Sequence, residues 1–72
     1  MTFGERLREC RKAKGLTQKK LGEKSGVHIN TIIYYENDSI EPKLFTISCI
    51  ATALGVSIDY LAGLSKYKYP NK

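Results

Sequence analysis

The chain has 72 residues, 42% of them hydrophobic, and a formal net charge of +5. This length allows one small domain with a core that is only just sufficient. No apolar run approaches the length of a transmembrane helix and no signal peptide opens the chain, so we expect a cytoplasmic protein with no membrane partner. Cys10 and Cys49 form neither a disulfide framework nor a CxxC motif, and with His28 they are too few for a metal site. Both cysteines fall on apolar helix faces, where we expect buried, inert thiols.

The positive charge is concentrated in the first third of the chain. Residues 1–24 contain eight basic side chains against three acidic ones, whereas residues 25–64 contain one against four. A basic segment of this kind suits a polyanionic partner. The alternative is that these lysines and arginines simply solvate helix faces.

The first predicted helix begins after Thr2 and ends at Gly15. Phe3, Leu7 and Cys10 recur at helical spacing on its apolar side. Thr2 with Glu5 three positions later has the pattern of a capping box.

Two short helices joined by a tight turn are predicted over residues 17–37. Thr17 can cap the first of them, at about residues 18–25, and Gly26 can end it in the left-handed conformation. Val27 then packs back over the turn. A second periodic run follows over residues 28–36, with His28 capping or flanking it. Helix, glycine turn and helix is the layout of a DNA-binding helix-turn-helix.

This stretch resembles the phage-repressor (Cro/Xre-type) helix-turn-helix family. The resemblance is carried by Thr17-Gln18, Leu21-Gly22-Glu23-Lys24, Ser25-Gly26-Val27, Thr31-Ile32, Tyr35-Glu36-Asn37, Pro42 and the run from Leu54 to Leu61. It implies an all-α, compact five-helix lambda-repressor-like DNA-binding domain over residues 1–64, followed by a short basic, tyrosine-rich tail over residues 65–72. Gly22 departs from the family, which prefers alanine there, and glycine permits close helix packing at some cost in helix propensity.

The helix at about residues 28–36 is the predicted recognition helix, which would enter the major groove. At 100° per residue its outer face contains Ile29, Asn30, Ile33 and Tyr34, while Thr31, Ile32 and Tyr35 face the core. The resemblance implies that the four outer residues read base edges. Asparagine can pair with adenine, and isoleucine can contact a thymine methyl group.

Two features of this region oppose a simple transfer of the family's chemistry. The helix has no arginine or lysine, and the loop after it is acidic. Asp38 can adopt a left-handed turn there but would repel a nearby phosphate. An apolar protein-binding patch formed by Ile29 and Ile33 is the alternative to base reading.

The resemblance also assigns residues around this helix. It implies a partly buried ion pair between Arg11 and Glu36, whereas two solvated charges would be the simpler interpretation. Expected contacts to DNA phosphates come from Gln18, Lys19, Asn37 and Lys43.

The last third of the chain predicts two more helices. Pro42 is expected to start the fourth helix, whose apolar stripe consists of Leu44, Ile47, Ile50, Ala51 and Leu54. Gly55 and Val56 predict its end, and Ser57 caps a short final helix. A weak homodimer is expected through Ile58, Tyr60, Leu61 and Leu64. The tail at residues 65–72 has no periodicity, and we expect it to be mobile or to be ordered only by a partner.

These patterns favour a sequence-specific, repressor-like transcriptional regulator that binds a double-stranded DNA operator as a homodimer. The alternative is a protein-interaction module, such as the antitoxin of a toxin–antitoxin pair. No catalytic motif accompanies the single histidine, so we expect neither an enzyme nor a cofactor.

Overall fold

The computed structural model describes residues 1–69, and all regular structure in this range is helical. This confirms the predicted all-α class with five helices. The helices are α1 (Phe3–Ala13), α2 (Gln18–Ser25), α3 (Ile29–Glu36), α4 (Leu44–Leu54) and α5 (Ile58–Ala62). No helix in this range is long and apolar enough to cross a bilayer. Within it, no cluster of three or more histidine, cysteine or acidic side chains is arranged to hold a metal ion.

The predicted helix starts are confirmed at three hydroxyl caps. The Thr2 hydroxyl accepts from the Glu5 N–H while the Glu5 carboxylate accepts from the Thr2 N–H, which completes the capping box of α1. Thr17 and Ser57 cap α2 and α5 in the same way. α4 instead begins two residues after Pro42, with Lys43 at the N-cap and no side chain bonded to the helix end.

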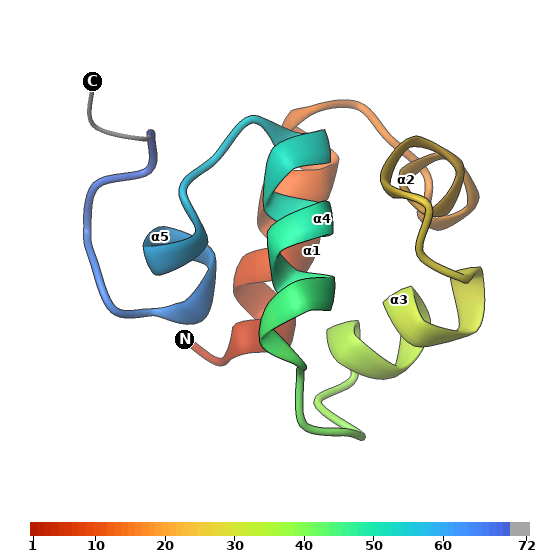
Figure 1. Ribbon diagram of the computed structural model, residues 1–72, viewed down its shortest axis with the longest axis horizontal. Coiled ribbons are helices and arrows are strands. Elements are labelled where there is room, and N and C mark those ends of the chain that lie inside the picture. Colours follow the sequence, from red (N-terminus) through yellow and green to blue (C-terminus); the bar gives the residue numbers. More distant parts are fainter. Residues whose placement is uncertain (70–72) are drawn as a thin grey trace.

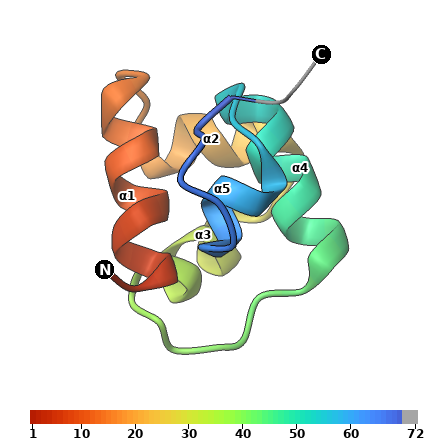
Figure 2. The same ribbon diagram turned by 90° about the vertical axis from the view of Figure 1, so that its left-hand side faces the viewer.

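The five helices enclose one core (Figure 1). α3 packs against α1 and α2, and α2 also contacts α4. α5 lies between α1 and α4 and contacts both (Figure 2). The largest fully buried side chains come from all five helices: Leu7, Leu21, Ile32, Tyr35, Ile50, Leu54 and Leu61.

The start of α1 lies directly against the end of α3. A Cβ atom on Gly4 would lie 2.5 Å from the carbonyl oxygen of Glu36 and 2.6 Å from that of Tyr35, so only glycine fits. The Gly4 N–H and the Thr2 hydroxyl donate to the two carboxylate oxygens of Asp38, at 2.9 and 2.7 Å. Asp38 has the predicted left-handed backbone, with φ of 56°. The Asp38 carboxylate therefore lies at the N-terminus of α1, where the helix dipole favours negative charge.

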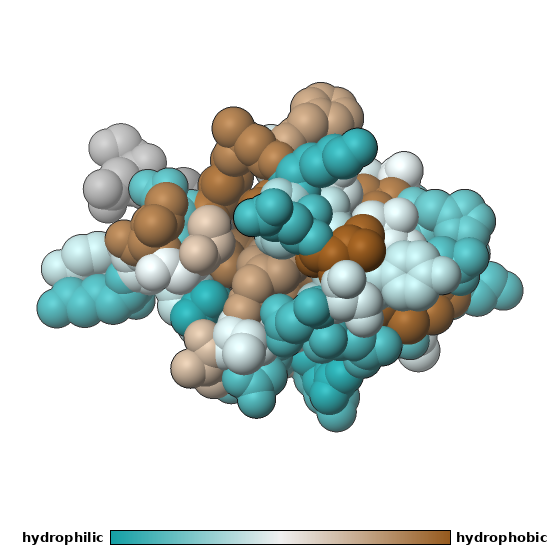
Figure 3. Space-filling view, turned by 90° about the horizontal axis from the view of Figure 1, so that it is seen from below, coloured by the Kyte–Doolittle hydropathy of each residue, from teal (hydrophilic) through white to brown (hydrophobic). Residues whose placement is uncertain are grey.

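The start of α4 differs from the predicted apolar stripe. Ile47, Ile50, Ala51 and Leu54 are buried as expected, but Leu44 is 73% exposed, because no other element within residues 1–69 covers the first turn of α4. Phe45 is also largely exposed, and Ile40 in the preceding loop is partly so. The view from below shows apolar side chains at the surface of this face (Figure 3).

The cysteines and the tail also depart in part from expectation. Cys10 is buried, which raises the pKa of its thiol despite the nearby charge of Lys68, but Cys49 is only half-buried.

After α5 the chain turns back across that helix (Figure 2). The Ser57 hydroxyl and N–H donate to the carbonyl oxygens of Tyr67 and Lys68, at 3.1 and 2.8 Å. The tail up to residue 69 is thus bonded to its own domain, and residues 70–72 of the predicted tail lie outside the described range.

Candidate nucleic-acid interface

The turn between α2 and α3 depends on two glycines. Gly26 ends α2 in the left-handed conformation, with φ of 75°, and its N–H donates to the Gly22 carbonyl at 2.9 Å. A Cβ atom on Gly22 would lie 2.8 Å from the carbonyl oxygen of Val27. Glycine at this position therefore lets the turn fold closely over α2, while Val27 packs against the core.

The outer face of α3 is exposed as predicted. Asn30 is exposed, Tyr34 is 48% exposed, and Ile29 and Ile33 are half-buried beside them. On the opposite face Ile32 and Tyr35 are fully buried, while Thr31 is half-buried. The helical phase is thus confirmed, and base reading by the outer residues stays a prediction.

Tyr35 fixes the inner face of α3 to two neighbouring elements. Its ring packs edge-on against Phe3 of α1, with 5.6 Å between ring centroids. Its phenol oxygen accepts from the Lys43 N–H at 3.1 Å, at the start of α4. The orientation of α3 is therefore set by contacts on its buried side.

The predicted pair of Arg11 and Glu36 is confirmed and is the centre of a larger network. Arg11 donates from Nε to Glu36 Oε2 at 2.6 Å and from Nη2 to Oε1 at 3.0 Å, and both residues are buried. The alternative of two solvated charges is therefore wrong. Arg11 also donates to the Leu16 carbonyl at 2.9 Å, just before α2.

Two further donors to Glu36 were missed from the sequence. Arg8 Nε and Gln18 Nε2 both donate to Glu36 Oε1, at 3.4 and 3.1 Å. Burial by itself would raise the pKa of Glu36, but the hydrogen bonds from Arg11 and Gln18 and the Arg11 charge outweigh it, so the pKa lies below its ordinary value. The carboxylate remains charged and connects α1, the start of α2 and the end of α3.

The four predicted phosphate-contacting residues lie at different positions around α3. Lys19, Asn37 and Lys43 are exposed, on α2, at the C-cap of α3 and at the N-cap of α4. Gln18 is half-buried with its amide bonded to Glu36, which leaves one side-chain N–H for a phosphate. Their contacts with DNA stay predictions.

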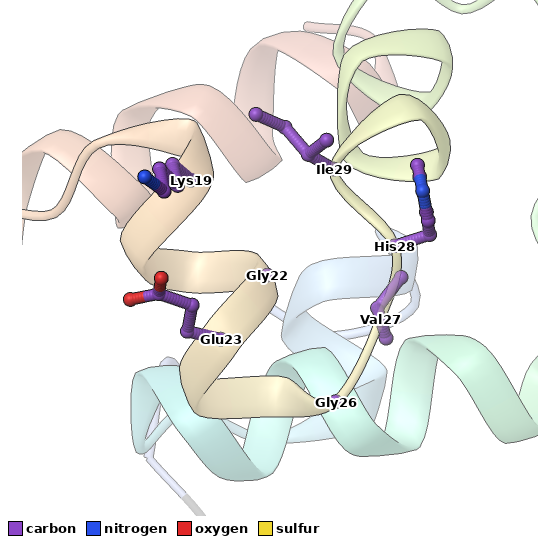
Figure 4. A pocket seen from close by; sticks show the side chains of 7 residues that line it. All are labelled: Lys19, Gly22, Glu23, Gly26, Val27, His28 and Ile29. Carbon is purple, nitrogen blue, oxygen red and sulfur yellow. The ribbon is translucent and has the colours of Figure 1, made fainter.

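His28 is the N-cap of α3, as predicted. Its Nδ1 accepts from the Asn30 N–H at 3.0 Å. A groove of about 480 Å³ separates the outer side of α2 from this end of α3, and Gly22 and Gly26 are among the residues that line it (Figure 4). Its other lining residues are Lys19, Glu23, Val27, His28 and Ile29.

One of the four predicted dimer contacts is wrong. Leu61 has 0% exposure because it fills the core between α1 and α4, so its side chain has no surface for a second copy. Leu64 is 80% exposed and Ile58 is 37% exposed, while Tyr60 is half-buried against the core. These three stay candidate contacts.

Known proteins resemble this chain over most of its length. A family model described as helix-turn-helix matches residues 7–61. The HTH-type transcriptional regulator ImmR of Bacillus subtilis is 35% identical over 72 residues, which cover 100% of this chain and 57% of the relative. The immunity repressor protein of Bacillus phage phi105 is 35% identical over 63 residues, covering 88% of this chain and 44% of the relative. The chain thus spans about half the length of the curated relatives it matches.

Two solved structures have the same fold. The restriction-modification controller protein C.AhdI from Aeromonas hydrophila superimposes with a TM-score of 0.79 at 39% identity, covering 82% of this chain and 89% of that one. The DNA-binding domain of the P22 c2 repressor superimposes with a TM-score of 0.80 at 33% identity, covering 94% and 92%. The chain belongs to the helix-turn-helix family of the phage-repressor (Cro/Xre) type.

Proposed function

We propose that this protein is a sequence-specific DNA-binding transcriptional regulator that inserts α3 into the major groove. The observation that carries the proposal is the outer face of α3, where Asn30 and Tyr34 are exposed. The buried side of the same helix is bonded to α1 through Arg11 and Glu36. No hydrogen bond within residues 1–69 uses the Asn30 amide or the Tyr34 hydroxyl, so both are free for base edges. Ile29 and Ile33 beside them supply apolar contacts of the kind that thymine methyl groups accept.

The charges around α3 support the same function. Lys19 and Lys43 flank the helix with exposed ammonium groups, and Asn37 adds an amide at its C-terminal end. Two of the carboxylates close to α3 are bonded within the domain: Glu36 to Arg11, and Asp38 to Thr2 and Gly4. Phosphate contacts from Gln18, Lys19, Asn37 and Lys43 would position α3 without reading sequence.

Two copies would bind two half-sites about 34 Å apart on a two-fold-symmetric operator. Ile58, Tyr60 and Leu64 are the candidate contacts between them. A regulator of this kind acts in the cytoplasm, in contact with the chromosome. The alternative, a protein-interaction module such as an antitoxin, is not favoured, because the curated relatives described above are named as a regulator and a repressor.

Selection from a randomised duplex library, followed by affinity titrations against salt, tests this function. A selected duplex should bind with a log–log salt slope of about −4 to −5, as four to six phosphate contacts per operator complex require. Lys19→Gln should reduce the magnitude of the slope by about 1 per subunit without changing the selected sequence. A flat salt response, or no enrichment of any sequence, would remove DNA as the specific ligand.

A further inference from the structure

We infer that two copies of this chain meet through the outer face of α4, with their Cys49 thiols facing each other across the two-fold axis. The inference rests on the proposed function, in which two copies bind one operator. It adds a surface on α4 to the candidate contacts Ile58, Tyr60 and Leu64, and it places a reactive side chain at the centre of that surface.

The outer face of α4 is an exposed stripe. Phe45, Cys49 and Thr52 follow one another at positions i, i+4 and i+7 on one face of the helix. Phe45 is 80% exposed and Thr52 is exposed, while Cys49 between them is half-buried. The Thr52 hydroxyl donates to the Ser48 carbonyl at 2.9 Å, so its proton is already bonded within the helix. Figure 1 shows α4 in front of α1, with no described helix on its other side.

The two ends of α4 differ in shape. At its start, Leu44 and Phe45 project as large apolar side chains, with 73% and 80% of their surfaces exposed. Near its end, a groove of about 330 Å³ lies between α4 and the start of α5. The groove is lined by Ala51, Thr52, Val56, Ser57, Ile58 and Asp59. Apolar side chains therefore project at one end, and a hollow that can receive them lies at the other.

A second copy of the same chain can use both ends at once. In a two-fold dimer the same patch is used on both copies, so each contact occurs twice. Two antiparallel α4 helices place Phe45 of each copy against the groove beside Ile58 of the other. The turn midway between Phe45 and Thr52 then lies at the axis, and it contains Ser48 and Cys49.

The charges at the two ends favour the same arrangement. Lys43 is exposed two positions before Phe45, and Asp59 is exposed beside the groove. Neither side chain makes an ion pair within residues 1–69. Antiparallel helices bring Lys43 of one copy to the end where the other copy has Asp59, whereas parallel helices would bring like charges together. This complementarity favours a second copy as the occupant of the surface.

The position of Cys49 makes the arrangement measurable. Packed helices have axes about 8–10 Å apart, and each Cα atom lies about 2.3 Å from its own axis. Two Cys49 residues that face each other across the pair therefore have Cα atoms roughly 4–7 Å apart, which overlaps the range of about 4.4–6.8 Å that a disulfide spans. The other thiol, Cys10, is 2% exposed and lies in the core.

The first test uses disulfide formation to measure this proximity. The wild-type chain and Cys10→Ala are incubated with oxidised glutathione, without DNA, and covalent dimers are quantified on non-reducing gels. One Cys49 thiolate attacks glutathione disulfide and releases a glutathione thiol, and Cys49 of the second copy then attacks the mixed disulfide and releases the other. Both proteins should become covalent dimers, whereas Cys49→Ser should not. As a matched control, Lys12→Cys in the Cys49→Ser background has an exposed thiol on α1 and should cross-link far more slowly.

The second test is sedimentation equilibrium under reducing conditions, also without DNA. Phe45→Ser should weaken dimerisation by more than roughly 100-fold, because each dimer loses two buried phenylalanine side chains. Lys43→Glu and Asp59→Lys should each weaken it by roughly 2- to 30-fold, as expected for two exposed ion pairs, and the double variant should restore it. Tyr67→Ser removes a 66% exposed aromatic side chain from the tail and should leave dimerisation unchanged.

Three outcomes would overturn the inference. If the Lys12→Cys control cross-links as fast as the wild-type chain, the disulfide reports random collisions. If the wild-type chain sediments as a dimer but Cys49 does not cross-link, the copies meet through another surface. If the chain is a monomer at every concentration, no such interface exists. Because neither assay contains DNA, failure of the proposed function would be a separate result, seen as the absence of any selected duplex.

Discussion

Replacing Gly4 with alanine should destabilise this domain, although the same change in an open helix would stabilise it. In a helix interior alanine is favoured over glycine by about 1 kcal/mol. Here the new Cβ atom would lie 2.5 and 2.6 Å from two backbone carbonyl oxygens of α3 and 2.8 Å from the Asp38 carboxylate. None of these distances is compatible with a real contact, so α1 and α3 must separate.

The size of the effect follows from what this separation breaks. Overpacking costs about 1–3 kcal/mol, and a hydrogen bond to a charged group, such as that from the Gly4 N–H to Asp38, contributes about 1.5–3 kcal/mol. After the helix-propensity gain is subtracted, the net loss is about 1.5–5 kcal/mol. For a domain of this size the melting temperature should fall by roughly 6–40 °C.

Thermal unfolding followed by far-ultraviolet circular dichroism measures this loss, with Gly15→Ala as the matched control. Gly15 has φ of +72°, and a Cβ atom added there would have no neighbour within 4 Å, so alanine meets only backbone strain. That strain should cost about 1–2 kcal/mol. A Gly4→Ala variant that melts at or above the wild-type temperature would refute the close approach of α1 and α3.

Three further perturbations test other parts of the structure. Glu36→Gln should lower stability at neutral pH by about 3 kcal/mol, because buried Arg11 loses its counter-charge. In the wild-type chain the ionised Glu36 carboxylate contributes fully to the free energy of unfolding above its ordinary pKa of 4.5, and this contribution is lost as the pH falls through the lowered pKa of the folded state. On acidification the free energy of unfolding should therefore decline less in Glu36→Gln than in the wild-type chain. Asn30→Ala or Tyr34→Ala should weaken binding to a selected duplex by roughly 1–3 kcal/mol while the melting temperature stays constant, and a collapse of stability would contradict the exposed position of both residues. Leu64→Ser should reduce cooperative operator binding without unfolding the monomer, whereas sedimentation showing a monomer at every concentration, with and without DNA, would exclude the dimer.

The sequence was sufficient where a local signal determines structure. Thr2, Thr17 and Ser57 were identified as caps from their hydroxyls, and Gly26 from the conformation that ends α2. Hydrophobic periodicity assigned Ile32 and Tyr35 of α3 to the core. The pairing of Arg11 with Glu36 came instead from the family resemblance, because 25 positions separate the two residues along the chain.

The sequence was insufficient where distant segments meet. Leu44 fits the spacing of the α4 stripe, but no element in the described part of the chain covers the first turn of that helix, so Leu44 is exposed. Leu61 is among the predicted dimer contacts, but its side chain is wholly used by the core. The bond from the Gly4 N–H to Asp38 spans 34 positions and the bond from Arg8 to Glu36 spans 28, so neither has a local pattern. The contact between Ser57 and the tail is made to backbone carbonyls, which every sequence has.

The network around Glu36 has a consequence for how this protein can change during evolution. Three of the contacts that orient α3 come from its inner side: the Glu36 carboxylate, the Tyr35 ring and the packing of Ile32. The exposed side chains on the outer side, Asn30 and Tyr34, make no hydrogen bond within residues 1–69, so we expect them to contribute little to stability. A new operator sequence can therefore be acquired by substitutions on the outer side alone, without compensating changes in the core. Duplicated copies of such a gene could diverge to separate DNA targets while they keep one scaffold.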